Sequence, residues 1–145
     1  NEITSIDSYT FYDCIGLTSI EIPSAALSIG YQAFYNCTGL STIIIPDSVT
    51  SIGYDAFSYC TGLKTIKIPG GIVSISDKAF YRCTSLKTVA INYGVESIKA
   101  SAFSYCSNLT SVTISYTITF IGRQAFSYCV SLNFNNNPLQ CYYHR

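Results

Sequence analysis

The segment LSTIIIPDSVTSIGYDAFSYC, residues 40–60, decides the fold of this chain. Leu40, Ile43 and Ile45 follow the spacing LxxLxL, and the last two apolar residues alternate as they do in a short strand. Pro46 follows and ends the strand, because a proline nitrogen cannot donate to a sheet ladder. The segment therefore opens with a short β-strand that has one apolar face.

The second half of the segment contains two further apolar groups. Val49 and Ile52 lie three residues apart and indicate a second inward-facing extended stretch. Ala56, Phe57 and Cys60 are spaced by three and four residues, which predicts one or two helical turns. A small or polar residue then suits a left-handed helix C-cap, and successive copies hold Gly16, Gly39, Gly62, Ser85, Asn108 and Ser131 there.

The same pattern recurs every 23 residues along the chain. Four positions keep one residue type in six successive copies: Phe11, Phe34, Phe57, Phe80, Phe103 and Phe126; Cys14, Cys37, Cys60, Cys83, Cys106 and Cys129; Leu17, Leu40, Leu63, Leu86, Leu109 and Leu132; Ile6, Ile29, Ile52, Ile75, Ile98 and Ile121. A unit this short cannot bury its own apolar face, so neighbouring units must stack into a solenoid with parallel strands. We predict a single α/β repeat solenoid of about six units over residues 1–145.

The two ends of the chain depart from the pattern. Asn135 and Asn137 replace apolar strand residues, so the last unit is expected to be degenerate. The chain begins in mid-unit without a polar cap, and an uncapped end is unusual for a complete solenoid. We therefore expect a fragment of a longer array.

The 23-residue unit with LxxLxL, IP, SIG and AFxxC resembles the leucine-rich repeat of the BspA type, most clearly at residues 17–37 and 40–60. This resemblance implies a curved right-handed solenoid with a parallel β-sheet on its concave side and short helices or turns on its convex side. It also implies a surface or secreted protein, since the family occurs in anaerobic bacteria and parasitic protists and includes adhesins for fibronectin and fibrinogen. Residues 137–141, NPLQC, resemble the opening of the C-terminal cap of extracellular eukaryotic leucine-rich repeat proteins.

The composition of the chain gives no reason to expect nucleic-acid binding, membrane insertion, catalysis or metal binding. Eight Lys and Arg balance eight Asp and Glu, so the net charge is zero and a nucleic-acid surface based on bulk positive charge is not expected. No apolar run is long enough to span a bilayer, so we expect no membrane insertion. His144 is the only histidine, and neither GxGxxG nor GxxxxGK[ST] occurs. We therefore expect no catalytic residues, no metal site and no cofactor.

The regular spacing of the cysteine column predicts reduced thiols rather than disulfides. Stacked side chains in one ladder lie parallel at about 4.8 Å, whereas a disulfide needs converging Cβ atoms at about 3.8 Å. We predict six buried thiols that pack as small hydrophobes. Cys141 lies outside the ladder and is predicted to be the most reactive thiol.

The outward positions of the strands are the candidate binding site, because the family uses its concave sheet for binding. One column carries hydroxyls, the next varies freely, and two lysines flank them. The twelve candidate residues are Ser19, Glu21, Thr42, Ile44, Lys64, Thr65, Lys67, Lys87, Thr88, Ala90, Ser111 and Thr113. Two interpretations remain open for this surface. It is a solvated Ser/Thr ladder that suits a pleated sheet, or it is a recognition site for a protein or glycan, with host matrix proteins as the implied partners.

The function expected from the sequence is a non-enzymatic adhesion module. The alternative is a structural repeat protein that self-assembles end to end into filaments or arrays. Tyrosines beside the AFxxC segments form either ring contacts between repeats or a partner surface. Asn36 and Asn108 match the glycosylation acceptor pattern.

Overall fold

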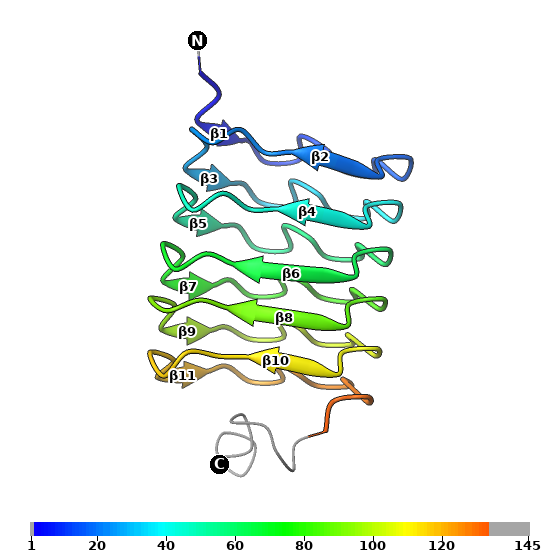
Figure 1. Ribbon diagram of the computed structural model, residues 1–145. Coiled ribbons are helices and arrows are strands. Elements are labelled where there is room, and N and C mark those ends of the chain that lie inside the picture. Colours follow the sequence, from blue (N-terminus) through cyan, green and yellow to red (C-terminus); the bar gives the residue numbers. More distant parts are fainter. Residues whose placement is uncertain (1, 134–145) are drawn as a thin grey trace.

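The computed structural model describes residues 2–133, which form a stack of coils with a 23-residue repeat (Figure 1). One side of the stack carries the longer strands β2 (Ser19–Glu21), β4 (Thr42–Ile44), β6 (Thr65–Ile68), β8 (Thr88–Ile91) and β10 (Ser111–Thr113). Another side carries the two-residue strands β1 (Ser5–Ile6), β3 (Ser28–Ile29), β5 (Ser51–Ile52), β7 (Ser74–Ile75), β9 (Ser97–Ile98) and β11 (Phe120–Ile121). The predicted solenoid is confirmed.

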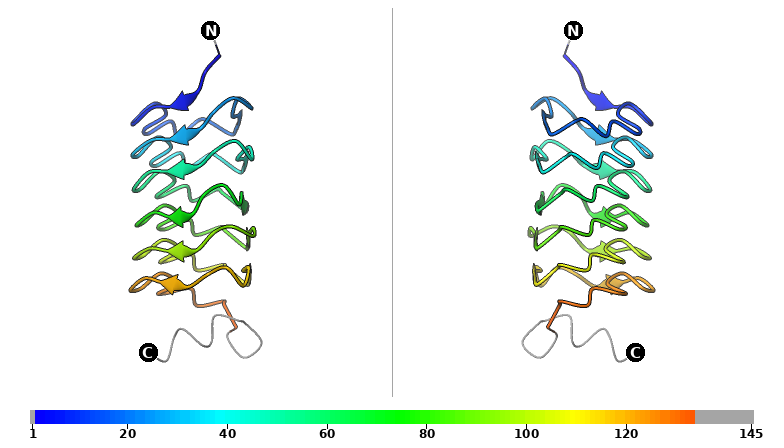
Figure 2. Two further views of the ribbon diagram at one scale, coloured as in Figure 1. Left: turned by 90° about the vertical axis from the view of Figure 1, so that its left-hand side faces the viewer. Right: turned by 90° about the vertical axis from the view of Figure 1, so that its right-hand side faces the viewer.

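Strand pairing is parallel and joins residues that lie 23 positions apart. Ile20 pairs with Ile43 between β2 and β4, and Ile66 pairs with Val89 between β6 and β8. Just before β6, the N–H of Lys64 donates to the carbonyl of Ser41 over 3.2 Å, so the coils that carry β4 and β6 are also linked. The stack is close to straight when it is viewed from either side (Figure 2). The curvature that the resemblance implied is therefore slight. The longer strands pair as two sheets, β2–β4 and β6–β8–β10, which adjoin at β4 and β6.

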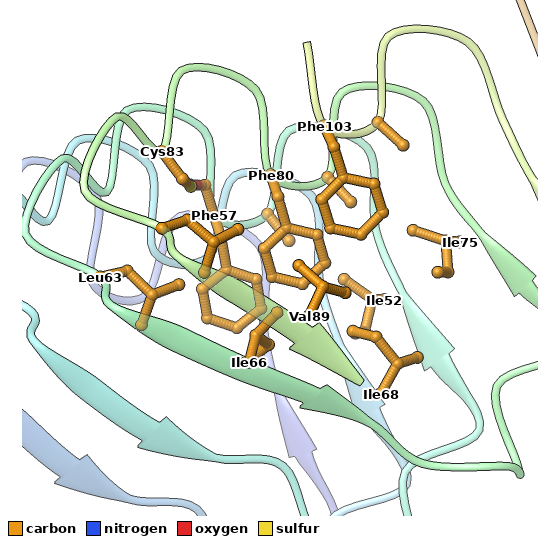
Figure 3. Packing of buried hydrophobic residues seen from close by; sticks show 14 of the residues in the cluster. Ile52, Phe57, Leu63, Ile66, Ile68, Ile75, Phe80, Cys83, Val89 and Phe103 are labelled. Atoms are coloured by element: carbon orange, nitrogen blue, oxygen red, sulfur yellow. The ribbon is translucent and has the colours of Figure 1, made fainter. Parts of the chain in front are cut away.

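A column of phenylalanines forms the centre of the core. Phe34, Phe57, Phe80 and Phe103 are fully buried, and their rings stack with centroids 5.0–5.2 Å apart and nearly parallel planes. Figure 3 shows the rings of Phe57, Phe80 and Phe103 among aliphatic side chains from the longer strands and from the short strands. Each ring contacts its equivalent in the next coil, which is the ladder that the 23-residue period predicts.

The cysteine column lies beside the phenylalanines as free thiols. The six ladder cysteines form no disulfide, as predicted, and five of them are buried, whereas the first is only half-buried: Cys14, Cys37, Cys60, Cys83, Cys106 and Cys129. The Sγ of Cys60 donates to the carbonyl of Phe34 over 3.1 Å, and each buried ladder thiol bonds in the same way to the phenylalanine 26 residues earlier. The thiols thus tie coils together as hydrogen-bond donors as well as filling space. Cys141, residues 135–137 and the cap-like segment 137–141 lie outside the described residues.

The predicted helices are wrong: residues 2–133 contain none, and each AFxxC segment is a run of β-turns. Phe34 donates its N–H to Ala56 in the next coil over 2.8 Å, whereas Cys37 donates to Phe34 in its own coil over 3.3 Å. Gln32 and Asn36 have left-handed backbones with φ of 49° and 58°. An α-helix would direct every N–H to its own i−4 carbonyl, so half of these donors could not bond the neighbouring coil. Stacking of the coils therefore favours turns in these segments. The fold is a β-solenoid and not the α/β solenoid that the sequence predicted.

The predicted C-cap column is also wrong. Left-handed residues occur at two other positions of each coil, one before the alanine and one two residues after the phenylalanine. Gly39 and Gly62 have no left-handed φ, but a Cβ on either would lie 2.6 or 2.5 Å from a carbonyl oxygen of the preceding coil. Glycine at these two places reflects the close approach of two backbones rather than the end of a helix.

Candidate binding surface

All twelve predicted site residues lie on or next to the longer strands and are brought to one face. We call the outward side of β2, β4, β6, β8 and β10 the long-strand face. The strands alternate exposed and buried residues, as β6 shows with exposed Thr65 and Lys67 and buried Ile66 and Ile68. Eleven of the twelve side chains are exposed, and Ala90 is half-buried. The alternation that predicted this face is confirmed.

Two rows of side chains cross the long-strand face at right angles to the strands. The hydroxyl row consists of Ser19, Thr42, Thr65, Thr88 and Ser111. The variable row consists of Glu21, Ile44, Lys67, Ala90 and Thr113. Lys64 and Lys87 directly precede β6 and β8, and the N–H of Lys87 donates to the carbonyl of Lys64 over 2.8 Å. Between paired strands, neighbouring members of a row are separated by about 4.8 Å.

Ile44 is the most unusual residue of the variable row. Its side chain is 82% exposed, although isoleucine is among the residue types most often buried. Glu21 is its direct register partner in β2, and Lys67 takes the equivalent position in β6. A depression of about 470 Å³ lies between β2 and β4, and one of about 400 Å³ lies between β4 and β6. Ile44 lines both, so a partner side chain can contact it from either flank.

The chemistry of the face is that of binding groups. It offers hydroxyls, ammonium groups, one carboxylate and one exposed aliphatic side chain within a few strand spacings. No cluster of three His, Cys, Asp or Glu that could hold a metal ion occurs among residues 2–133. In the same part of the chain, no helix of a length and hydrophobicity suited to crossing a membrane is found.

The AFxxC segments carry a row of tyrosine rings, and we call this surface of the coils the tyrosine side. Tyr81 and Tyr105 lie 5.5 Å apart between centroids, and Tyr105 and Tyr128 lie 4.4 Å apart. The guanidinium of Arg82 lies 4.7 Å from the centroid of Tyr105 and also contacts the rings of Tyr59 and Tyr81. The ring contacts between repeats that the sequence offered as one alternative are thus present. The sequence analysis did not predict that Arg82 takes part in these ring contacts, although Arg82 shares the 23-residue column of Tyr59 and Tyr105.

The two candidate glycosylation asparagines are engaged within the fold. The amide nitrogen of Asn36 donates to the Asp13 carboxylate over 2.8 Å. The amide nitrogen of Asn108 donates to the carbonyl of Thr84 over 2.7 Å. The amide nitrogen is also the atom that accepts the sugar, and after modification only one N–H would remain on it to donate to these partners.

Comparison with known proteins identifies the repeat. The family described as "BspA type Leucine rich repeat region" matches residues 4–133 in six copies. No match was found among the curated proteins.

Three solved structures have the same fold. The T. pallidum leucine-rich repeat protein TpLRR is 26% identical, with a TM-score of 0.71 over 91% of this chain and 72% of that one. A leucine-rich repeat protein from Bacteroides ovatus is 28% identical, with a TM-score of 0.67 over 88% of this chain and 39% of that one. A leucine-rich cell surface protein from Faecalibacterium prausnitzii is 31% identical, with a TM-score of 0.60 over 90% of this chain and 42% of that one. The chain thus spans less than half of the last two proteins.

Proposed function

The chain belongs to the BspA-type leucine-rich repeat family, and from this premise we propose that it is a non-enzymatic adhesion module that binds a protein through its long-strand face. The partner class is an extracellular matrix protein, and the location is the cell surface or the extracellular space. The description of the Faecalibacterium prausnitzii relative as a cell surface protein supports this location.

One observation supports the choice of face: the variable row changes chemistry from coil to coil on a scaffold that does not. The inward positions of the same strands carry only isoleucine or valine, at Ile20, Ile43, Ile66, Val89 and Val112. The outward positions of the variable row carry a carboxylate, an aliphatic chain, an ammonium group, a methyl and a hydroxyl. No packing requirement selects these exposed side chains, so their differences are available for recognition.

A protein partner fits this face better than a glycan. The exposed apolar group is the aliphatic Ile44, flanked by a carboxylate and an ammonium group, and binding energy tends to concentrate in a few such central residues. None of the twelve residues of the face is aromatic, so none offers a ring on which a sugar can stack, and the exposed rings of Tyr93 and Tyr116 lie beyond the ends of β8 and β10.

A binding measurement with a matched pair of double variants tests the proposal. Ile44→Ser with Lys67→Ser should weaken binding to immobilised fibronectin at least tenfold, about 1.4 kcal/mol. The control, Val73→Ser with Arg123→Ser, also removes one exposed β-branched residue and one cation, but from outside the long-strand face. It should bind as the unchanged chain does. Both double variants should melt within a few degrees of the unchanged chain, because surface substitutions usually shift stability by about 0.5 kcal/mol or less.

Two results would contradict the proposal. In the first, the double variant at Ile44 and Lys67 still binds, but the double variant Tyr59→Ala with Tyr105→Ala does not. The binding site would then lie on the tyrosine side. An unchanged chain that binds neither fibronectin nor fibrinogen would exclude the matrix proteins that the family suggests as partners.

A further inference from the structure

The charges of this neutral chain are separated along the axis of the solenoid. Residues 1–63 contain six acidic residues and no lysine or arginine, whereas residues 64–145 contain all eight basic residues and two acidic ones. Since the coils stack in sequence order, one half of the stack is acidic and the other is basic (Figure 1).

The variable row repeats this charge order on a smaller scale. Glu21, Ile44 and Lys67 occupy one column on three successive coils, with Ile44 in the middle. Glu21 lies on the strand before Ile44, and Lys67 lies on the strand after it. The row is therefore complementary to itself when it is reversed.

We propose that a second copy of this chain binds to the long-strand face, around a twofold axis that runs along β4. Such an axis between two facing sheets places β4 against β4 and β2 against β6. The Ile44 side chains then meet at the centre, and Glu21 of each copy faces Lys67 of the other. Facing sheets pack about 10 Å apart, which side chains of this length can bridge from both sides.

The arrangement accounts for three features of the face at once. It covers the Ile44 side chain, which is 82% exposed in the single chain. It fills the two depressions beside Ile44 with side chains of the second copy. It also neutralises Glu21 and Lys67, which lie two coils apart in one chain and are separated by Ile44. The nearly straight stack allows two such faces to approach each other (Figure 2).

This inference rests on the proposed function, because it assigns a second copy to the surface that we propose for adhesion. Self-association would then cover that surface at high local concentration, and a matrix protein would compete with it. The area of contact is small and its charge pairs are exposed, so the dimer is expected to be weak and sensitive to salt.

Charge-reversal variants studied by sedimentation velocity test the proposal. The unchanged chain should shift from monomer to dimer over a roughly hundredfold range of concentration. Glu21→Lys alone and Lys67→Glu alone should each raise the dissociation constant at least tenfold, because a symmetric dimer contains every altered contact twice. An equimolar mixture of the two single variants should form a heterodimer, since each then supplies the charge that the other lacks.

Matched controls separate this contact from a change in net charge. Glu96→Lys and Arg123→Glu make the same charge changes at exposed positions outside the long-strand face and should leave dimerisation unchanged. Circular dichroism melts verify that every variant is folded.

Three results would overturn the inference: an unchanged chain that stays monomeric throughout, a dimer that survives both single reversals, or a mixture without heterodimer. Each is independent of the adhesion proposal, because a monomeric chain can still bind fibronectin and a dimeric one can fail to bind it.

Discussion

The tyrosine side and the long-strand face differ in how successive coils contact each other. On the tyrosine side, side chains contact their equivalents one coil away, as the rings of Tyr105 and Tyr128 do at 4.4 Å and Arg82 does against three tyrosines. On the long-strand face, the coils are joined by backbone pairing, and Ile44 extends into solvent with 82% of its surface exposed. Backbone hydrogen bonds join the coils on both sides, and on the tyrosine side the side chains of successive coils contact one another as well.

The largest expected effect comes from breaking the phenylalanine ladder. Phe80→Ala should lower the free energy of unfolding by about 3–5 kcal/mol, because it removes a fully buried ring that stacks on Phe57 and Phe103. Each coil contacts only its neighbours, so urea unfolding should also split into two transitions. Ile44→Ala, which also shortens a large apolar side chain, is the control on the long-strand face and should cost about 0.5 kcal/mol or less. Equal losses of unfolding free energy in the two variants would show that a ring of the core ladder stabilises the fold no more than an exposed side chain of the long-strand face does.

A smaller effect should follow from raising the pH. Burial raises the pKa of the Cys37 thiol from 9.0 to about 11, so the folded chain holds this proton more tightly than the unfolded chain does. The stabilisation is complete below pH 9 and is lost as the pH rises towards 11, and a shift of this size corresponds to about 3 kcal/mol. Cys37→Ala should therefore lose less stability over this pH range than the unchanged chain does, as measured by urea unfolding at each pH. Identical pH profiles would show that Cys37 is not the group responsible.

The smallest effect should come from the cation on the tyrosine side. Arg82→Ala should lower the melting temperature slightly, because it removes a guanidinium that contacts rings in three coils. Lys67→Ala removes a cation from the long-strand face and should have an effect near zero. The difference between the two melting temperatures measures how much the side-chain ladder contributes beyond the backbone. A larger drop in melting temperature for Lys67→Ala than for Arg82→Ala would contradict this expectation.

The candidate site was predictable from the sequence as a set of positions. Alternation along residues 65–68 places Thr65 and Lys67 outside and Ile66 and Ile68 inside, and the 23-residue period carries this assignment to every coil. The relation among Glu21, Ile44 and Lys67 was missed. The signal was present in the order of charges along the chain, but it becomes spatial only when these residues are known to lie on three successive strands.

The sequence by itself determined the repeat, the core columns and the exposed face, because a strict period leaves only one register in which like residues stack. Only the tertiary structure decided the conformation of the AFxxC segments. A spacing of three and four residues fits a helix and a run of turns equally well, and the choice depends on where the N–H groups find acceptors. Here the Phe34 N–H finds the carbonyl of Ala56 at 2.8 Å in the next coil. That partner exists only once the coils are stacked, so the left-handed residues and the turns are properties of the stack rather than of any single repeat.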